Sequence, residues 1–238
     1  PDTAAAPNPY RLQRVEDFLA RVGDGLLTLS CRESNIAPDS LLAIDRRRAK
    51  ELKAGDASWI TQFERGVSQA LIKQYTNSVN TYTAAIDRNP SNPFLYFNRS
   101  TTRAEMIDFI SSIDNSYQRI TIDSDPANRL NNNSKRTYSY DEAVADLNKA
   151  LKLFPDFAHA YYNRANLQAL SGRLPEAFED YTKAIGLNPS FAEAYYNRGI
   201  VQIFMKDTRK GCLDLSKAGE LGITEAYEVL KRYAQTQD

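Results

Sequence analysis

The stretch YYNRANLQALSG at residues 161–172 is followed by YYNRGIVQIFMK at residues 195–206. The two segments share their first four residues, Tyr-Tyr-Asn-Arg, and then diverge. A catalytic motif in duplicate is one interpretation, and a structural unit that stacks against a copy of itself is the other. We favour the second interpretation because the same interval relates residues over most of the chain.

The interval between the two segments is a period of about 34 residues, a length found in helical repeats. Pro155 and Pro189 are separated by one such period, but Asn98 and Asn163 are separated by almost two. One unit therefore contains an insertion. The sequence divides into units at 59–92, 93–157, 158–191 and 192–223, with the insertion at about 107–137 of the second unit.

This pattern resembles the tetratricopeptide repeat (TPR), which has an aromatic residue early in its first helix, a small residue four positions later, alanines in its second helix and a closing proline. The residues that carry the resemblance are Tyr161, Ala165, Ala177, Tyr181, Ala184 and Pro189 in one unit, and Tyr195, Gly199, Gly211, Leu215 and Ala218 in the next. The overall pattern is similar to that of uncharacterised bacterial TPR proteins. The resemblance implies an all-α fold, a right-handed superhelix (α-solenoid) of helix-turn-helix repeats with a C-terminal capping helix at 224–236.

Residues 1–58 do not fit the repeat. They are predicted to form a non-repeat segment that caps the first unit of a TPR domain at 59–236. A helix is predicted over 39–52, with Arg46 to Arg48 on its solvated side. Because the chain begins at Pro1, we expect a processed or excised piece, which leaves the cellular compartment undetermined.

Local signals place the helices within a unit. In the third unit the first helix is expected over about 157–170, to end at Gly172, with a second helix from Pro175. The insertion is predicted to lengthen the preceding helix to about Ile113 and then to form a polar surface loop.

The first helix of each unit has two opposite faces when its residues are placed at 100° per residue. One face combines a tyrosine with a small residue, which is typical of closely packed helices. We assign this face to the core; its members are Tyr96, Tyr161, Tyr195, Gly66, Ser100, Ala165 and Gly199.

The opposite face is expected to line the concave groove of a TPR superhelix. The candidate peptide-binding residues on it are Phe63, Phe97, Asn98, Thr101, His159, Tyr162, Asn163, Asn166, Tyr196, Asn197 and Ile200. An asparagine amide both donates and accepts hydrogen bonds, so Asn98, Asn163 and Asn197 predict a ladder for the backbone of an extended peptide. The alternative is that these asparagines bridge neighbouring helices inside the solenoid.

The charge on this face indicates the kind of partner. The chaperone-binding subclass of the family captures a C-terminal carboxylate with lysines, an arginine and asparagines. Here the predicted groove positions include Glu64, Glu105 and Glu193 but neither lysine nor arginine. An acidic ligand would be repelled, so we reject the carboxylate clamp and expect a neutral or basic protein or peptide.

The repeated arginines have acids at a matching distance along the chain. Asp180 follows Arg164 at the same interval at which Asp214 follows Arg198. The equivalent partner of Arg99 is Asp146, beyond the insertion. These spacings predict ion pairs inside each hairpin, a structural role, whereas the equivalent partner position of Arg65 holds Thr81.

Composition excludes other classes of function. The chain has 30 basic and 30 acidic residues, which gives no electrostatic footprint for nucleic acid. Its apolar runs are too short for a membrane span. His159 is the only histidine, and Cys31 and Cys212 lack metal-ligand spacing. We therefore predict no enzyme, no metal and no cofactor.

The expected function is that of a protein-interaction adaptor that binds an extended peptide or partner segment in its groove. The alternative is a structural or oligomerising scaffold module that uses the insertion or the N-terminal segment. The sequence does not determine the oligomeric state.

Overall fold

The turn that follows the first helix of a unit sets the fold. At equivalent positions of three units, Lys73, Gly172 and Lys206 have φ angles of 62°, 75° and 67°. The next residue in each turn donates its backbone N–H to a carbonyl five residues earlier, as Arg173 does to Gln168 over 2.8 Å. This left-handed closure satisfies the last carbonyls of the helix and reverses the chain.

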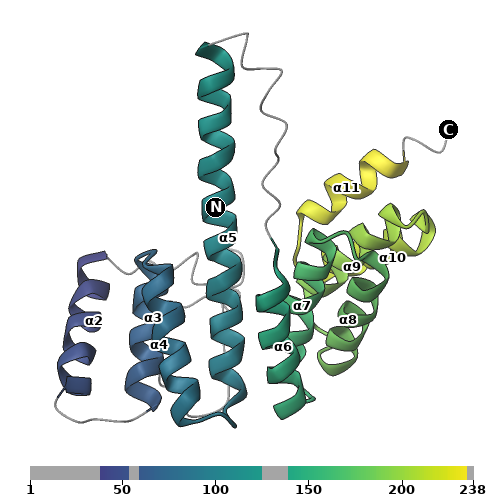
Figure 1. Cartoon of the computed structure of the whole chain (residues 1–238). Helices are drawn as coiled ribbons and strands as arrows, with labels where there is room; N and C mark the ends of the chain where they lie inside the picture. The colour runs from purple at the N-terminus through teal and green to yellow at the C-terminus, as the bar shows by residue number, and fades with distance from the viewer. Residues whose placement is uncertain (1–37, 54–58, 125–138, 235–238) are drawn as a thin grey trace, which may run out of the picture.

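The computed structural model describes residues 38–53, 59–124 and 139–234, and every regular element in these ranges is a helix (Figure 1). The helices are α2 (Pro38–Lys53), α3 (Trp59–Leu71), α4 (Tyr75–Arg88), α5 (Pro93–Ser124), α6 (Asp141–Leu153), α7 (Ala158–Leu170), α8 (Leu174–Leu187), α9 (Ala192–Phe204), α10 (Thr208–Glu220) and α11 (Glu225–Ala234).

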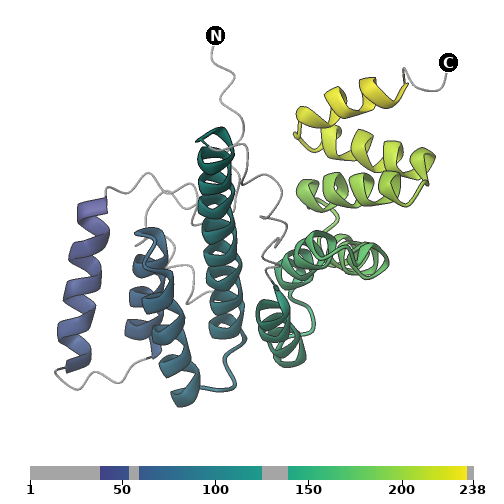
Figure 2. The ribbon, with the colours of Figure 1, turned by 45° about the horizontal axis from the view of Figure 1, so that its top comes forward.

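Each helix packs mainly against the helices before and after it in the chain. The pairs α3–α4, α5–α6, α7–α8 and α9–α10 are the four expected hairpins, α2 packs against α3, and α11 packs against α10. The helix axes change direction along the series, as the second view shows (Figure 2). The described chain is an all-α solenoid, as the sequence predicted.

The helix before the insertion is longer than expected. The prediction ended it near Ile113, but α5 continues to Ser124 and projects beyond its neighbours (Figure 1). The position equivalent to the left-handed turn residue is Ile107. A β-branched residue strongly disfavours a positive φ, so the chain continues as helix there. The predicted loop is therefore wrong as far as Ser124, and residues 125–138 lie outside the described residues.

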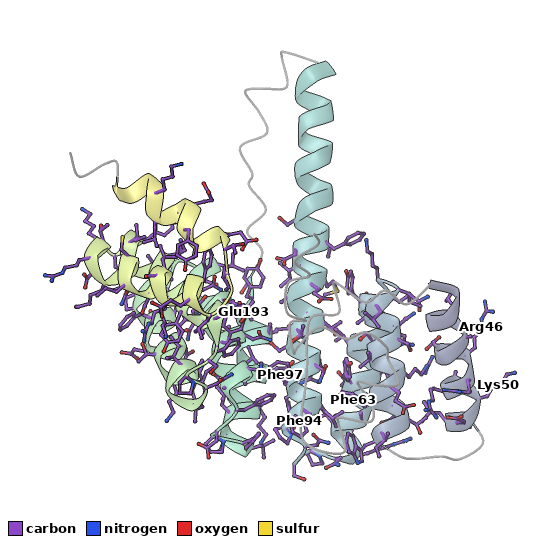
Figure 3. The ribbon with its side chains drawn as sticks, turned by 180° about the vertical axis from the view of Figure 1, so that it is seen from behind. Arg46, Lys50, Phe63, Phe94, Phe97 and Glu193 are labelled. Atoms are coloured by element: carbon purple, nitrogen blue, oxygen red, sulfur yellow. The ribbon has the colours of Figure 1, made fainter. Side chains whose placement is uncertain are left out.

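The predicted solvated side of α2 is correct for two of its three consecutive arginines. Arg46 and Arg47 are exposed, and Arg46 points outward with Lys50 (Figure 3). Arg48 instead forms ion pairs with Glu51 and with Glu64 of α3. Residues 1–37 of the predicted N-terminal segment lie outside the described residues.

Small residues let the helices of a hairpin approach closely. A Cβ atom on Gly199 would lie 2.8 Å from the backbone oxygen of Gly211, and one on Gly66 would lie 2.7 Å from the ring of Tyr82. Ser100 and Ala165, at equivalent positions, are buried. The predicted core face is confirmed: Tyr96 is buried, and Tyr161 and Tyr195 pack against the core.

Candidate functional site

The first helices of three successive units enclose a hollow of about 540 Å³. Its walls are α5, α7 and α9, with Tyr181 reaching in from α8. The lining residues are Ser100, Thr101, Ala104, Glu105, Asp108, Tyr162, Asn163, Asn166, Leu167, Ala169, Leu170, Tyr181, Asn197, Ile200 and Val201. We call this hollow the central hollow. Six candidate residues line it: Thr101, Tyr162, Asn163, Asn166, Asn197 and Ile200.

Three other candidates lie in the interior, so their predicted place on an open groove is wrong. Phe63 and Phe97 are 0% exposed and Asn98 is 3% exposed. Phe97 packs on Phe157, the residue just before α7, with ring centroids 4.7 Å apart, and both Phe63 and Phe97 lie between helices (Figure 3). Phe63 is likewise covered by aromatic rings, those of Trp59 and Tyr82. The Asn98 amide donates to the Phe94 carbonyl of its own helix over 2.8 Å.

The remaining two candidates, His159 and Tyr196, are not among the residues that line the central hollow. Tyr196 packs against the small core beneath α11. His159 lies beside the Phe191 ring, with centroids 5.1 Å apart. Burial lowers the pKa of His159 to about 4, so its imidazole is neutral near pH 7.

A hydrogen-bonded network forms one wall of the central hollow. The Asn197 Nδ2 group donates to the Tyr162 hydroxyl over 3.1 Å and to Asn166 Oδ1 over 3.0 Å. The Tyr181 hydroxyl donates to the same Asn166 oxygen over 2.6 Å. The Asn166 oxygen thus accepts two hydrogen bonds. These bonds orient the amide so that its Nδ2 group points away from the Asn197 and Tyr181 donors. Burial raises the pKa of Tyr162. The hydrogen bonds with Asn166 and Asn197 lower it by less, so the pKa stays above its ordinary value.

Asn163 and Asn197 thus bridge neighbouring helices, which was the alternative interpretation of the repeated asparagines, whereas Asn98 bonds within its own helix. Asn163 is held loosely, with Nδ2 3.4 Å from the Thr101 hydroxyl oxygen. Bridging does not use every polar atom, because an amide offers two N–H donors and an oxygen with two lone pairs. The wall is therefore both part of the solenoid and a polar surface that faces the hollow.

The opposite wall carries negative charge. Among the described residues that line the central hollow, Glu105 and Asp108 of α5 are the charged ones, and none is a lysine or arginine. The Tyr140 hydroxyl donates to Asp108 Oδ1 over 2.9 Å. Sequence reasoning placed Glu105 on this face but missed Asp108, because Asp108 lies in the insertion and reaches the hollow only through the extension of α5. It also missed Tyr181, whose hydroxyl enters from a second helix.

The repeated arginines are structural, as predicted. Arg164 forms two hydrogen bonds to Asp180, and Arg198 forms two to Asp214, with distances of 2.7–2.8 Å. Arg99 binds Asp146 in the same way over 2.9 and 2.6 Å. Arg65, which has no acid at the equivalent position, pairs with Asp45 of α2 over 2.9 Å.

The described residues provide no sign of a metal centre: none of their histidine, cysteine, aspartate and glutamate side chains form a group of three or more suited to a metal ion. In the same ranges, no helix combines the length and the apolar character that crossing a membrane requires.

Comparison with known proteins identifies the repeat. Residues 139–172 and 169–203 match the family model described as TPR repeat. A search of curated proteins gave no match.

Solved structures show the same fold over most of the chain. MamA has 19% identity and a TM-score of 0.57, with 77% of this chain and 89% of that chain covered. A MamA fragment from Desulfovibrio magneticus RS-1 has 14% identity and a TM-score of 0.54, with 77% and 95% covered. YrrB, described as a TPR protein with an unusual peptide-binding site, has 15% identity and a TM-score of 0.57, with 96% and 94% covered.

Residues 139–203 are therefore tetratricopeptide repeats, and the described chain has the all-α fold of tetratricopeptide-repeat proteins. Such proteins are typically interaction modules rather than enzymes, because stacked repeats create an extended concave surface for a partner.

Proposed function

We propose that the chain is an adaptor that holds an extended protein segment, neutral or basic in charge, in the central hollow. The observation that carries this proposal is the composition of the hollow: an asparagine wall on α7 and α9 faces an acidic wall on α5. Amide side chains pair with a peptide backbone of any sequence. The described part of the lining contains acidic side chains but neither lysine nor arginine, and this favours a partner that brings positive charge.

The extent of the lining over several repeats supports a peptide rather than a small compact ligand. The lining residues come from three successive repeats, so a ligand that fills the hollow contacts all three. Apolar area comes from Leu170, which is 63% exposed at the rim, and from Ile200. An exposed leucine beside polar groups suits a partner side chain that buries it on binding.

The likeness to YrrB also supports this proposal, since a protein of the same fold is described as having a peptide-binding site. Nucleic acid is a poorer partner for this surface, because lysine and arginine supply most of the affinity for phosphates and neither is among the described residues that line the central hollow.

A phage-displayed library of random peptides selected on the purified chain tests the proposal. We expect the enriched peptides to be neutral or basic. Their affinity should fall roughly tenfold or more in Leu170→Arg, which places a cation at the rim, and should also fall in Asn163→Ala. Asn163 is suited to this test because its hydrogen bond to Thr101 is long, at 3.4 Å, so its loss should disturb the solenoid little.

Leu213→Arg is the matched control, because Leu213 is 66% exposed on α10 and does not line the hollow. Its affinity for the same peptides should equal that of the unaltered chain. Equal binding by all three folded variants would place the partner on another surface and would contradict the proposal, as would a selection that enriches no peptide.

A further inference from the structure

A second hollow lies on the other side of α5. It measures about 360 Å³ and lies where α3 turns into α4. Its lining residues are Ala70, Leu71, Lys73, Tyr75, Glu105, Asp108 and Phe109. We call it the side hollow. The Tyr75 and Phe109 rings form an aromatic corner in it, with centroids 5.7 Å apart.

The two hollows meet at a pair of acidic residues. Glu105 and Asp108 line both of them. They are three residues apart on one helix, so their side chains are neighbours on the same face. The concave surface is therefore continuous from the side hollow, across α5, to the central hollow.

Charge is distributed unevenly along this surface. In the side hollow the Lys73 ammonium lies over the Phe109 ring, 5.8 Å from its centroid, and partly balances the acids. On the side of the central hollow, the lining residues that the structure describes include neither lysine nor arginine. Glu105 and Asp108 are thus the side chains of the described lining that offer negative charge to a basic partner.

We propose that the two hollows form one binding surface for an extended peptide that places a lysine or arginine side chain between Glu105 and Asp108. Its flanking apolar side chains lie on the Phe109 corner at one end and on Leu170 at the other. This inference rests on the proposed function and adds to it the length of the surface and the position of the charged contact.

The extension of α5 is the element that creates this surface. In the units whose turns are described, the chain reverses at Lys73, Gly172 and Lys206, whereas α5 continues through the equivalent position. Asp108 and Phe109 line the surface because the helix continues through them. The insertion and the groove, which the sequence presented as alternative sites, thus contribute to one surface.

Peptides enriched on the unaltered chain are the probe. The double variant Glu105→Gln with Asp108→Asn removes both charges and keeps the size of the side chains, and Asn can still accept from Tyr140. We expect basic peptides to bind it roughly three- to tenfold more weakly, since partly exposed ion pairs are individually modest. Their affinity should also depend less on salt concentration than it does with the unaltered chain. Phe109→Ala should weaken binding at the other end by a similar factor.

The matched control is Glu176→Gln with Glu225→Gln, which changes net charge equally at two exposed positions outside both hollows. It should bind as the unaltered chain does. If Leu170→Arg weakens binding while the acidic double variant and Phe109→Ala bind normally, the inference is overturned and the proposed function stands. If none of these folded variants changes the affinity, both are overturned.

Discussion

At the scale of single residues, the arginine of each described repeat ties neighbouring helices together. Arg164 binds Asp180 in its own hairpin and donates to Asn148 of the preceding hairpin over 2.7 Å. It also lies over the Tyr161 ring at 5.5 Å. A planar guanidinium is suited to this task because its donors form a rigid fork with an apolar face.

Replacing Arg164 by alanine should reduce the free energy of unfolding by about 2–4 kcal/mol, because it leaves the Asp180 carboxylate nearly buried without its partner. Arg173→Ala is the control: its pair with Asp141 is 3.5 Å long and its partner is 76% exposed, so the loss should stay below about 1 kcal/mol. Urea denaturation of the two variants measures both values, and equal losses would contradict the assigned role of Arg164.

His159 makes stability depend on pH. Its pKa is about 4 in the folded chain against an ordinary value of 6.5. As pH falls from 6.5 towards 4, the unfolded chain gains a proton that the folded chain does not take up, so stability decreases over that window. The contribution amounts to about 3 kcal/mol by pH 4.

This loss should be absent in His159→Gln, whose side chain does not titrate. Denaturation curves of both proteins at pH 7 and pH 4 isolate the effect of His159 from that of the carboxylates, which both proteins share. A drop in stability that is equal in the two proteins would show that burial does not perturb this histidine.

At the scale of helices, the crossing of α9 and α10 depends on two glycines. The Cβ atom of an alanine at position 199 would meet the Gly211 backbone oxygen at 2.8 Å. Backbone cannot retreat as a flexible side chain does, so the two helices would have to move apart.

We expect Gly199→Ala to lower the free energy of unfolding by about 1–3 kcal/mol. Gly186→Ala, in α8, is the contrasting variant because nothing lies within 4 Å of its added Cβ. It should stabilise the chain by roughly 0.4–1 kcal/mol through the helix preference of alanine and the entropy of the unfolded state. Thermal unfolding of both variants should shift in opposite directions; a shift in the same direction would refute the close crossing.

At each connection between helices, one residue decides whether the first helix ends in a turn. A turn needs a residue that tolerates positive φ, and glycine does so without strain at position 172. Lys73 and Lys206 adopt the same conformation at a cost. Ile107 stands at the equivalent place in the second unit, where the helix does not end. The length of α5 can thus be traced to local chemistry that the repeat pattern alone did not reveal.

At the scale of the whole molecule, the solenoid is a row of hairpins, each of which contacts mainly its neighbours. Its last hairpin is covered by α11, in which Ala226 is buried and Tyr227 lies against Gly219 of α10. At the other end, α2 packs on α3 and supplies Asp45 to Arg65. Both ends of the solenoid are thus covered by a further helix, through the same kinds of contact that join the hairpins: an Arg–Asp pair at one end and a tyrosine packed on a small residue at the other.

The sequence by itself determined the features that repeat. The period of the units, the order of the helices, the close glycine contacts and the Arg–Asp pairs all follow from residues that recur in register. Such features can be predicted because each hairpin has nearly the same local environment, so one unit explains the others.

Only the tertiary structure decided which groove residues are open to a partner. Phe97 and Asn98 occupy the same helical positions as Tyr162 and Asn163, yet the first two are buried and the second two line the central hollow. The difference arises from how each unit is covered by the next and from the extension of α5, which also brings in Asp108. Burial depends on the packing of neighbours from distant parts of the chain, and this information is absent from the period of a single helix.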